Sequence, residues 1–87
     1  MTELPFSAPA ERNKQPIFDV LRQVLAAQGN ALEIASGTGQ HVAWFAAGSP
    51  QWSWQPTDAE PSALGPIAAR VVQERLSNVL APLLSLP

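Results

Sequence analysis

The residues that could support chemistry lie in a short segment, Leu32–Gly39, with the sequence LEIASGTG. Glu33 precedes a turn that contains Gly37 and Gly39, and an apolar helix is predicted to follow. Glycine permits positive φ and close approach of a ligand, and the first N–H groups of a helix are free to bind that ligand. Asp58 follows the next predicted strand, where a carboxylate can accept hydrogen bonds from two ribose hydroxyls. The pattern predicts a site for a nucleotide-like ligand.

The chemistry around the glycines narrows the class of ligand. A phosphate-binding P-loop is excluded, because no Gly-Lys-Ser/Thr follows the glycines. The dinucleotide fingerprint needs a small residue where Val42 stands, and a valine hinders close packing of helix and strand there. The charge of Glu33 also disfavours a pyrophosphate. An acid before the glycines favours a ligand with a cationic end and no phosphate, such as S-adenosylmethionine.

The segment before the site predicts an amphipathic helix. Residues 1–12 are expected to form an extended lead-in. The helix is predicted to begin at Asn13 as its cap, with Pro16 in its first turn and Gly29 just beyond its end. Its apolar stripe consists of Ile17, Leu21, Val24 and Leu25.

The rest of the chain alternates strands and helices. The pattern predicts a buried strand over 31–35, a helix over 40–48, a strand over 51–55, a helix over 61–76 and a strand that begins over 78–80. Gly65 and Pro66 are expected to break or delay the first turn of the last helix. This order predicts an α/β fold with a Rossmann-like parallel sheet and flanking helices, limited to the N-terminal βαβαβ portion and therefore truncated. Three strands leave an edge uncovered, so we expect self-association through the exposed sheet edge.

Composition excludes several classes of protein. The chain has 87 residues, enough for one small domain, and its net charge is −2 with scattered basic residues, which disfavours a nucleic-acid partner. With no cysteine and one histidine, no metal site is expected. No apolar run is long enough to span a membrane, and the N-terminal segment lacks the apolar core of a signal peptide. A cytoplasmic protein with no membrane partner is predicted.

Four segments carry a resemblance to a known family. LEIASGTG resembles the acid-x-Gly-x-Gly-x-Gly motif of class I S-adenosylmethionine-dependent methyltransferases, with Ala35 in place of the first glycine. The order AERNKQPI, LEIASGTGQH, WQPTD and NVLAPL is similar to a methyltransferase-like family of undefined substrate, over most of the chain. The resemblance implies that residues 1–87 form the N-terminal part of one such domain, with the helix and βαβαβ over 13–87. It implies methyl transfer to an unknown acceptor, by a chain that is incomplete.

The resemblance also assigns roles to individual residues. Glu33 would lie near the methionine part of the cofactor, and Asp58 would hold its ribose hydroxyls. Arg12 and Asn13 belong to a polar segment that can fold over the cofactor site in this fold class. The cofactor-binding residues implied in this way are Glu33, Ala35, Gly37, Gly39, Asp58, Arg12 and Asn13. Catalysis in such enzymes is an in-line transfer that depends on positioning and on exclusion of water, and no catalytic residue is assigned.

Simpler interpretations stay open. Asp58 could only cap the next helix, Glu60 could compete for the ribose, and His41 at a helix start is more often structural than a base. The tryptophans are expected to be packing aromatics. At the level of the whole protein, one alternative is a catalytically inactive truncated product or an interaction module. A further alternative is a dinucleotide-binding half-domain of an oxidoreductase, which Val42 disfavours.

Overall fold

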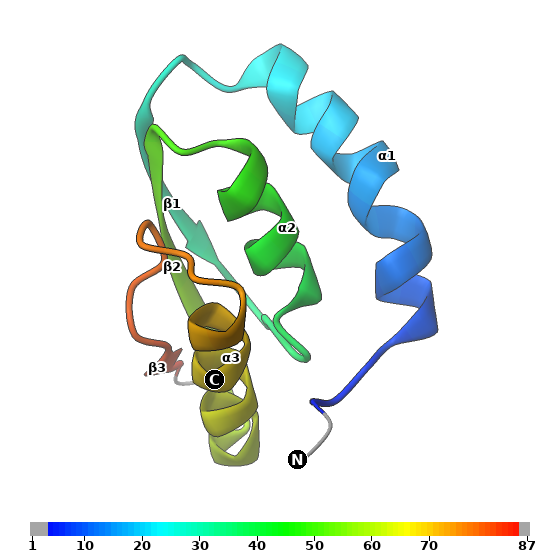
Figure 1. Ribbon diagram of the computed structural model, residues 1–87, viewed down its shortest axis with the longest axis vertical. Coiled ribbons are helices and arrows are strands. Elements are labelled where there is room, and N and C mark those ends of the chain that lie inside the picture. The colour runs from blue at the N-terminus through cyan, green and yellow to red at the C-terminus, as the bar shows by residue number, and fades with distance from the viewer. Residues whose placement is uncertain (1–3, 86–87) are drawn as a thin grey trace.

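A computed structural model describes residues 4–85, which form a layer of three helices against a parallel three-stranded sheet (Figure 1). The elements are α1 (Ala8–Val24), β1 (Gly29–Glu33), α2 (Gln40–Gly48), β2 (Trp52–Asp58), α3 (Pro61–Gln73) and β3 (Leu83–Leu84). The strands lie in the order β1-β2-β3, and both neighbouring pairs are parallel. The predicted α/β class with a Rossmann-like parallel sheet is confirmed. The start of the predicted lead-in and the end of the C-terminal tail lie outside the described residues.

Helix α1 begins earlier than predicted, so the assignment of Asn13 as its cap was wrong. The helix starts at Ala8, and the Ser7 hydroxyl accepts a hydrogen bond of 3.2 Å from the backbone N of Ala10. Pro9 occupies the first turn, where its missing N–H has no helical partner to lose. Residues 8–12 of the predicted extended lead-in are therefore helical, because Ser7 and Pro9 supply a start signal upstream of Asn13.

The predicted end of α1 was also wrong. The helix ends at Val24 with Pro16 in its interior, and Gly29 is the first residue of β1 instead of a helix terminus. Gly29 lies opposite Trp52 in the sheet, and a Cβ on this glycine would come within 2.8 Å of the indole ring. The requirement for glycine at this position thus comes from the packing of an aromatic ring on the sheet.

All three strands differ from their predicted bounds, and the central one, predicted over 51–55, extends over Trp52–Asp58, so Asp58 ends the strand instead of following it. The predicted strand over 31–35 is displaced to 29–33. Leu32 within it is 63% exposed and Ile34 just after it is 67% exposed, so the predicted burial of this segment was wrong. The predicted strand at 78–80 is reduced to one parallel bridge between Val79 and Trp54, and the third strand forms at Leu83–Leu84. The side chains of β1 alternate between half-buried and exposed, whereas both residues of β3 are exposed.

Helix α3 is continuous through Gly65 and Pro66, so the predicted break was wrong. A proline removes its own N–H from the helical hydrogen bonds. Ile67, the next residue, has no exposed surface. Because most helical stability in proteins comes from burial of an apolar face, this packing offsets the lost hydrogen bond.

The core lies between the helices and the sheet. The Phe45 ring centroid is 5.8 Å from that of Phe18 and 5.7 Å from that of Trp54. The predicted apolar face of α2 is confirmed, since its residues are buried among these rings; this face consists of Val42, Phe45 and Ala46. Of the tryptophans, Trp54 is buried and Trp52 partly buried, whereas Trp44 is exposed on α2 beside Lys14.

All three helices cover one face of the sheet, and the other face carries no helix within residues 4–85 (Figure 1). Leu32 and Leu83 lie on that face according to the strand register and are exposed, as is Ile34 just after β1. The outer edge of β1 pairs with no strand in the same range. No helix of the described residues has the length and apolarity to cross a membrane, and no cluster of metal-ligating side chains occurs among them.

Candidate functional site

The glycine-rich turn between β1 and α2 has an unusual backbone. Ala35, Gly37 and Gly39 have φ angles of 58°, 56° and 79°. The turn is fixed to the end of β2, because Ser36 donates its N–H to Thr57 O at 2.8 Å and its hydroxyl accepts the Thr57 N–H at 3.1 Å. Positive φ costs a residue with a Cβ roughly 1–2 kcal/mol, so Ala35 holds a conformation that glycine would adopt more easily.

Asp58 braces this turn from the end of β2. Its Oδ2 accepts the N–H of Gly37 at 2.8 Å, and its Oδ1 accepts the N–H of Glu60 at 2.9 Å. The backbone N–H groups of Glu60 and Gly37 hold the pKa of Asp58 below its usual value. The side chain is buried, with 8% exposure. Each carboxylate oxygen has two lone pairs, so both oxygens keep capacity for another donor. Glu60 occupies the N-cap position of α3, a role that the sequence pattern alone allows for Asp58.

Glu33 carries an unsatisfied acceptor at the last position of β1. Within the described part of the chain, its Oε1 is the buried side-chain atom without a hydrogen-bond partner. Burial raises the pKa of Glu33, against the opposing effects of the Ser36 hydroxyl and of His41. Buried polar groups in proteins are nearly always hydrogen-bonded, and this oxygen keeps its capacity to accept from a donor.

A cavity of about 250 Å³ lies over the turn. Its lining combines the turn with the start of α1 and consists of Ser7, Ala10, Ala35, Ser36, Gly37, Thr38 and His41. Two of the predicted cofactor-binding residues, Ala35 and Gly37, thus line it directly. Glu33 and Asp58 are not among the lining residues, and Asp58 is joined to the lining by its hydrogen bond from Gly37.

The other predicted residues are placed differently. Gly39 is buried with a φ of 79°, a conformation that favours glycine, whereas a Cβ on it would lie 3.5 Å from Ile67, an ordinary contact distance. Arg12 and Asn13 are exposed on α1 and are not among the residues that line the cavity. It is the first turn of α1, which starts at Ala8, that lies against the glycine-rich turn, and Arg12 and Asn13 follow it along the helix.

His41 forms part of the cavity wall. Its Nε2 lies 3.2 Å from Ala10 O, and its ring centroid is 5.5 Å from that of Phe45. Because a carbonyl oxygen only accepts, Nε2 must carry the proton of this hydrogen bond, which leaves Nδ1 as the acceptor of a neutral ring. The contacts of His41 are therefore those of a structural residue, although its ring also lines the cavity.

Sequence reasoning missed Gln40 and Arg70. Gln40 is 5% exposed, and its side-chain amide joins the turn to the start of α1. Arg70 donates from α3 to the carbonyls of Thr38 and Pro5. A polar residue at the start of an otherwise apolar helix was a usable signal for Gln40. The contacts of Arg70 join segments far apart in the chain, and no local pattern indicates them.

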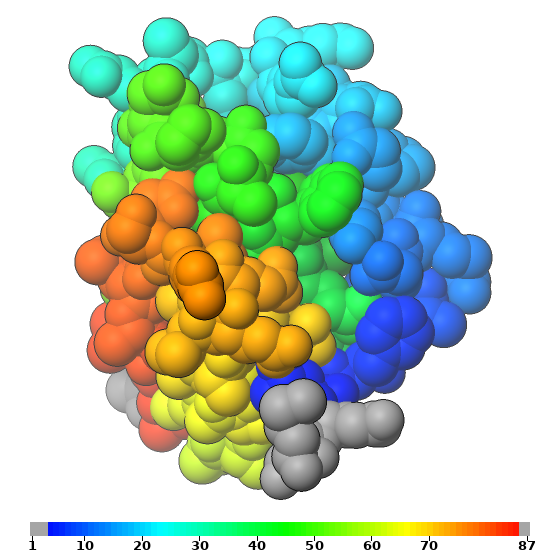
Figure 2. Space-filling view, viewed as in Figure 1, coloured from blue at the N-terminus to red at the C-terminus, as the bar shows by residue number. Residues whose placement is uncertain are grey.

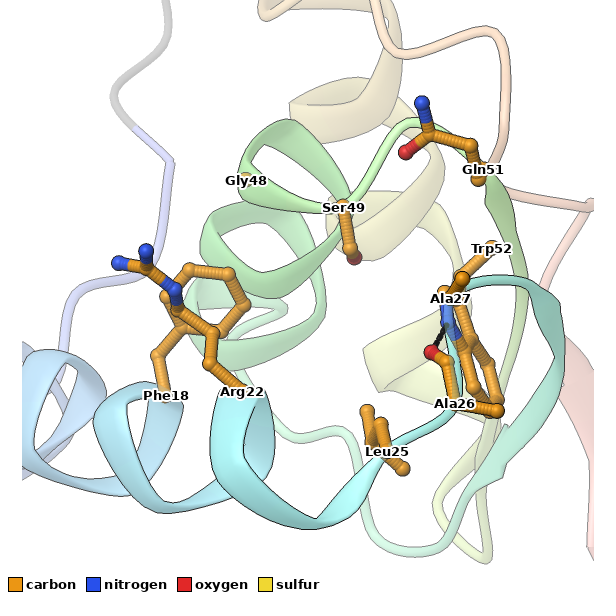
Figure 3. A pocket seen from close by; sticks show the side chains of 9 residues that line it. All are labelled: Phe18, Arg22, Leu25, Ala26, Ala27, Gly48, Ser49, Gln51 and Trp52. Atoms are coloured by element: carbon orange, nitrogen blue, oxygen red, sulfur yellow. Dashed lines mark hydrogen bonds between the residues drawn. The ribbon is translucent and has the colours of Figure 1, made fainter.

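A second cavity of about 240 Å³ lies at the opposite end of the sheet (Figure 3). Its lining is mainly aromatic and aliphatic, and Trp52 Nε1 donates to Ala26 O there at 2.9 Å. It consists of Phe18, Arg22, Leu25, Ala26, Ala27, Gly48, Ser49, Gln51 and Trp52. Ligands of open α/β sheets bind outside the carboxyl ends of the strands, whereas this cavity lies at their amino ends. The cavity over the glycine-rich turn is therefore the candidate site.

A parallel sheet, a glycine-rich turn after the first strand and a carboxylate at the end of the second strand together define a Rossmann-like α/β arrangement. The sequence model of one protein family, described as "Protein of unknown function (DUF938)", matches residues 4–85. The chain belongs to this family.

Proposed function

We propose that the protein is S-adenosylmethionine-dependent and methyltransferase-like, with the cofactor bound at the glycine-rich turn and an unknown methyl acceptor. The observation that carries the proposal is the buried Oε1 of Glu33, which has no partner in the described chain. A carboxylate in this position stabilises a cationic donor and repels a phosphate. The amino group and sulfonium of S-adenosylmethionine are cationic, and the molecule has no phosphate.

The residues present fit one part of such a cofactor. Glu33 would accept from its amino group, and the free lone pairs of Asp58 would accept from the ribose hydroxyls. The cavity of about 250 Å³ is at or below the lower limit of typical ligand pockets, roughly 300–1,000 Å³, so the described residues would enclose only part of the ligand. When bound, the cofactor supplies an electrophilic methyl group. The chain's own contribution is to bind, to orient and to exclude water.

A dinucleotide ligand is less well supported. Val42 has no exposed surface and packs in the core, where the fingerprint needs a small residue. The unsatisfied carboxylate of Glu33 would also face a pyrophosphate as a like charge.

An interaction module is the second candidate, and a specific observation favours it. Leu32 in β1 and Ile34 just after it are exposed beside the unpaired edge of β1, and Leu83 is exposed on β3 at the opposite edge of the sheet. Such a surface favours association. Self-association is expected as a molar mass that rises with concentration in light scattering, and Leu32→Lys should abolish the rise. A monomer at all concentrations would contradict this second candidate.

Cytoplasmic localisation belongs to the proposal as well. The absence of cysteine from the sequence supports it, since disulfides are typical of exported proteins and rare in the cytosol. Fractionation of cells that express the chain tests it, and recovery in an exported fraction would contradict it.

The direct test is an amide NMR titration of the ¹⁵N-labelled 87-residue chain with S-adenosylhomocysteine and, separately, with NAD. Shifts at Gly37, Gly39 and Asp58 are expected with the first ligand and not with the second. Asp58→Asn should weaken binding by about tenfold or more, the effect of one lost charged hydrogen bond. Glu60→Gln is the matched control and should leave binding unchanged. No shift with S-adenosylhomocysteine would overturn the proposal.

A further inference from the structure

The beginning of the described chain folds back onto the glycine-rich turn. We call residues 5–11 the N-terminal strap. In the space-filling view this blue segment lies beside α3, drawn in yellow (Figure 2), where Arg70 Nη2 donates to Pro5 O at 2.6 Å. At its other end, Ala10 O lies 3.2 Å from Nε2 of His41. The strap is thus held at both ends by helices that follow it in the sequence.

Gln40 makes the central contacts between strap and turn. Its Oε1 accepts from the Ser7 N–H at 2.6 Å and from the Thr38 hydroxyl at 2.8 Å. Its Nε2 donates to Glu11 Oε1 at 3.1 Å. The side chain is almost fully buried, and a buried amide is stable only when such partners are present. One side chain therefore satisfies groups on the strap and on the turn at once.

Arg70 supports the same junction from α3. Its Nε donates to Thr38 O at 3.0 Å, while its Nη2 holds Pro5. Thr38 thus donates its hydroxyl to Gln40 and accepts a hydrogen bond from Arg70 at its carbonyl. These contacts fix the residue between Gly37 and Gly39, the two glycines of the turn.

The strap is one wall of the candidate site. Ser7 and Ala10 line the cavity together with Gly37 and Thr38 of the turn. The wall has few apolar contacts of its own, since Pro5 and Phe6 are exposed and Ser7 is half-buried. Its position therefore depends on the hydrogen bonds to Gln40 and Arg70.

We propose that Gln40 is a positioning residue, which holds the N-terminal strap against the glycine-rich turn so that ligand affinity depends on Gln40 without contact between its side chain and the ligand. The identity of the ligand in this inference rests on the proposed function. The role of Gln40 in holding the strap rests on the hydrogen bonds alone. An occupant of the cavity would contact strap and turn together and would stabilise their junction. Ligand binding and ordering of the strap are then coupled.

The test exchanges the two groups that meet at the junction. Gln40→Glu keeps the acceptor for Ser7 and Thr38 but sets a second carboxylate against Glu11, and adding Glu11→Gln restores a donor–acceptor pair with the roles reversed. Gln23→Glu, on the exposed side of α1, is the matched control for the same chemical change.

Hydrogen exchange of the Ser7 amide without ligand is the first measurement. We expect Gln40→Glu to speed this exchange about tenfold or more through local opening, and the double variant and Gln23→Glu to exchange like the wild type. Unchanged exchange in Gln40→Glu, or no rescue by Glu11→Gln, would overturn the positioning role. A thermal melt of each variant separates local opening from global unfolding, which would speed exchange in the core of β2 as well.

The affinity for S-adenosylhomocysteine is the second measurement. Affinity should fall about tenfold in Gln40→Glu and return to within about threefold of the wild type in the double variant. Equal affinity in wild type and Gln40→Glu would overturn the coupling. If the wild type does not bind at all, the proposed function fails and the coupling to this ligand fails with it, whereas the exchange measurement still decides the positioning role.

Discussion

The two cavities at opposite ends of the sheet have nearly equal volumes, about 250 and 240 Å³, but very different walls. The wall at the carboxyl ends contains a backbone with positive φ, three hydroxyl-bearing residues and a histidine, near carboxylates at the ends of β1 and β2. The wall at the amino ends is dominated by Phe18, Leu25 and Trp52. Size therefore does not identify a site in this fold. The carboxyl end offers hydrogen-bonding groups that the fold does not fully use, and the amino end offers packing.

The largest expected effect is on stability, at the amino end. Phe18 is 6% exposed and stacks on Phe45, so Phe18→Ala should cost about 3–5 kcal/mol. That is a large fraction of the roughly 5–15 kcal/mol that stabilises a typical domain. Urea denaturation followed by circular dichroism measures it. Val20→Ala, on the exposed side of the same helix, is the control, and a similar loss in both variants would contradict the comparison.

A smaller loss is expected at the carboxyl end from Asp58→Asn. An asparagine has one acceptor oxygen, so the N–H of Gly37 or of Glu60 loses its partner, at about 1–3 kcal/mol. The lowered pKa of Asp58 sets the pH dependence: its stabilisation is present above the ordinary value of 3.8 and is lost as the pH falls through the folded-state pKa. Wild type and variant should therefore converge in acid. Denaturation curves at several pH values check this, and a constant gap would refute it.

Glu33→Gln should change stability in the opposite direction. Burial raises the pKa of Glu33, so the folded state binds this proton more tightly, and the wild type loses stability as the pH rises from about 4.5 through the folded-state pKa. At neutral pH the uncharged glutamine should stabilise by about 1 kcal/mol, which raises the melting temperature by about 4–8 °C. Binding of S-adenosylhomocysteine should weaken in the same variant. Parallel loss of stability and binding would show that Glu33 is a structural carboxylate.

The smallest effect is expected away from both cavities. A Cβ at Gly65 meets nothing within 4 Å, so Gly65→Ala should stabilise α3 by about 0.5–1 kcal/mol and leave ligand binding unchanged. Gly48→Ala is the matched change at the amino-end cavity, where the new Cβ would lie 2.5 Å from the Phe18 ring. Overpacking there should destabilise by about 1–3 kcal/mol. The same sign for both substitutions in thermal melts would be evidence against the close packing at the amino end.

Local patterns in the sequence predicted the elements whose signals are local. The bounds of α2 agree with its prediction, because Gly39 caps its start and Gly48 is the last of its nine residues. The third strand was misplaced because Val79 and Leu83 pair with β2, from which α3 separates them in the sequence. Local residue patterns do not indicate such long-range pairing. For the site, the turn and both carboxylates were predictable from glycine spacing and strand ends.

The contacts that position the site were not predictable in the same way. Arg70 bonds to Pro5 across nearly the whole chain, and no periodicity relates the two residues. The start of α1 was missed because Asn13 also satisfies the rules for a cap, and only the hydrogen bond from Ala10 to Ser7 decides between the two.

The positions of the three tryptophans determine which events intrinsic fluorescence can detect in this protein. Trp54 lies in the core, Trp52 at the amino-end cavity and Trp44 beneath the Lys14 ammonium at 4.0 Å, and none of them lines the cavity over the turn. Intrinsic emission will therefore follow unfolding closely, while a ligand at the turn leaves all three indoles untouched. A fluorescence titration therefore has no reporter at the candidate site, and an unchanged emission spectrum would not show whether a ligand binds there.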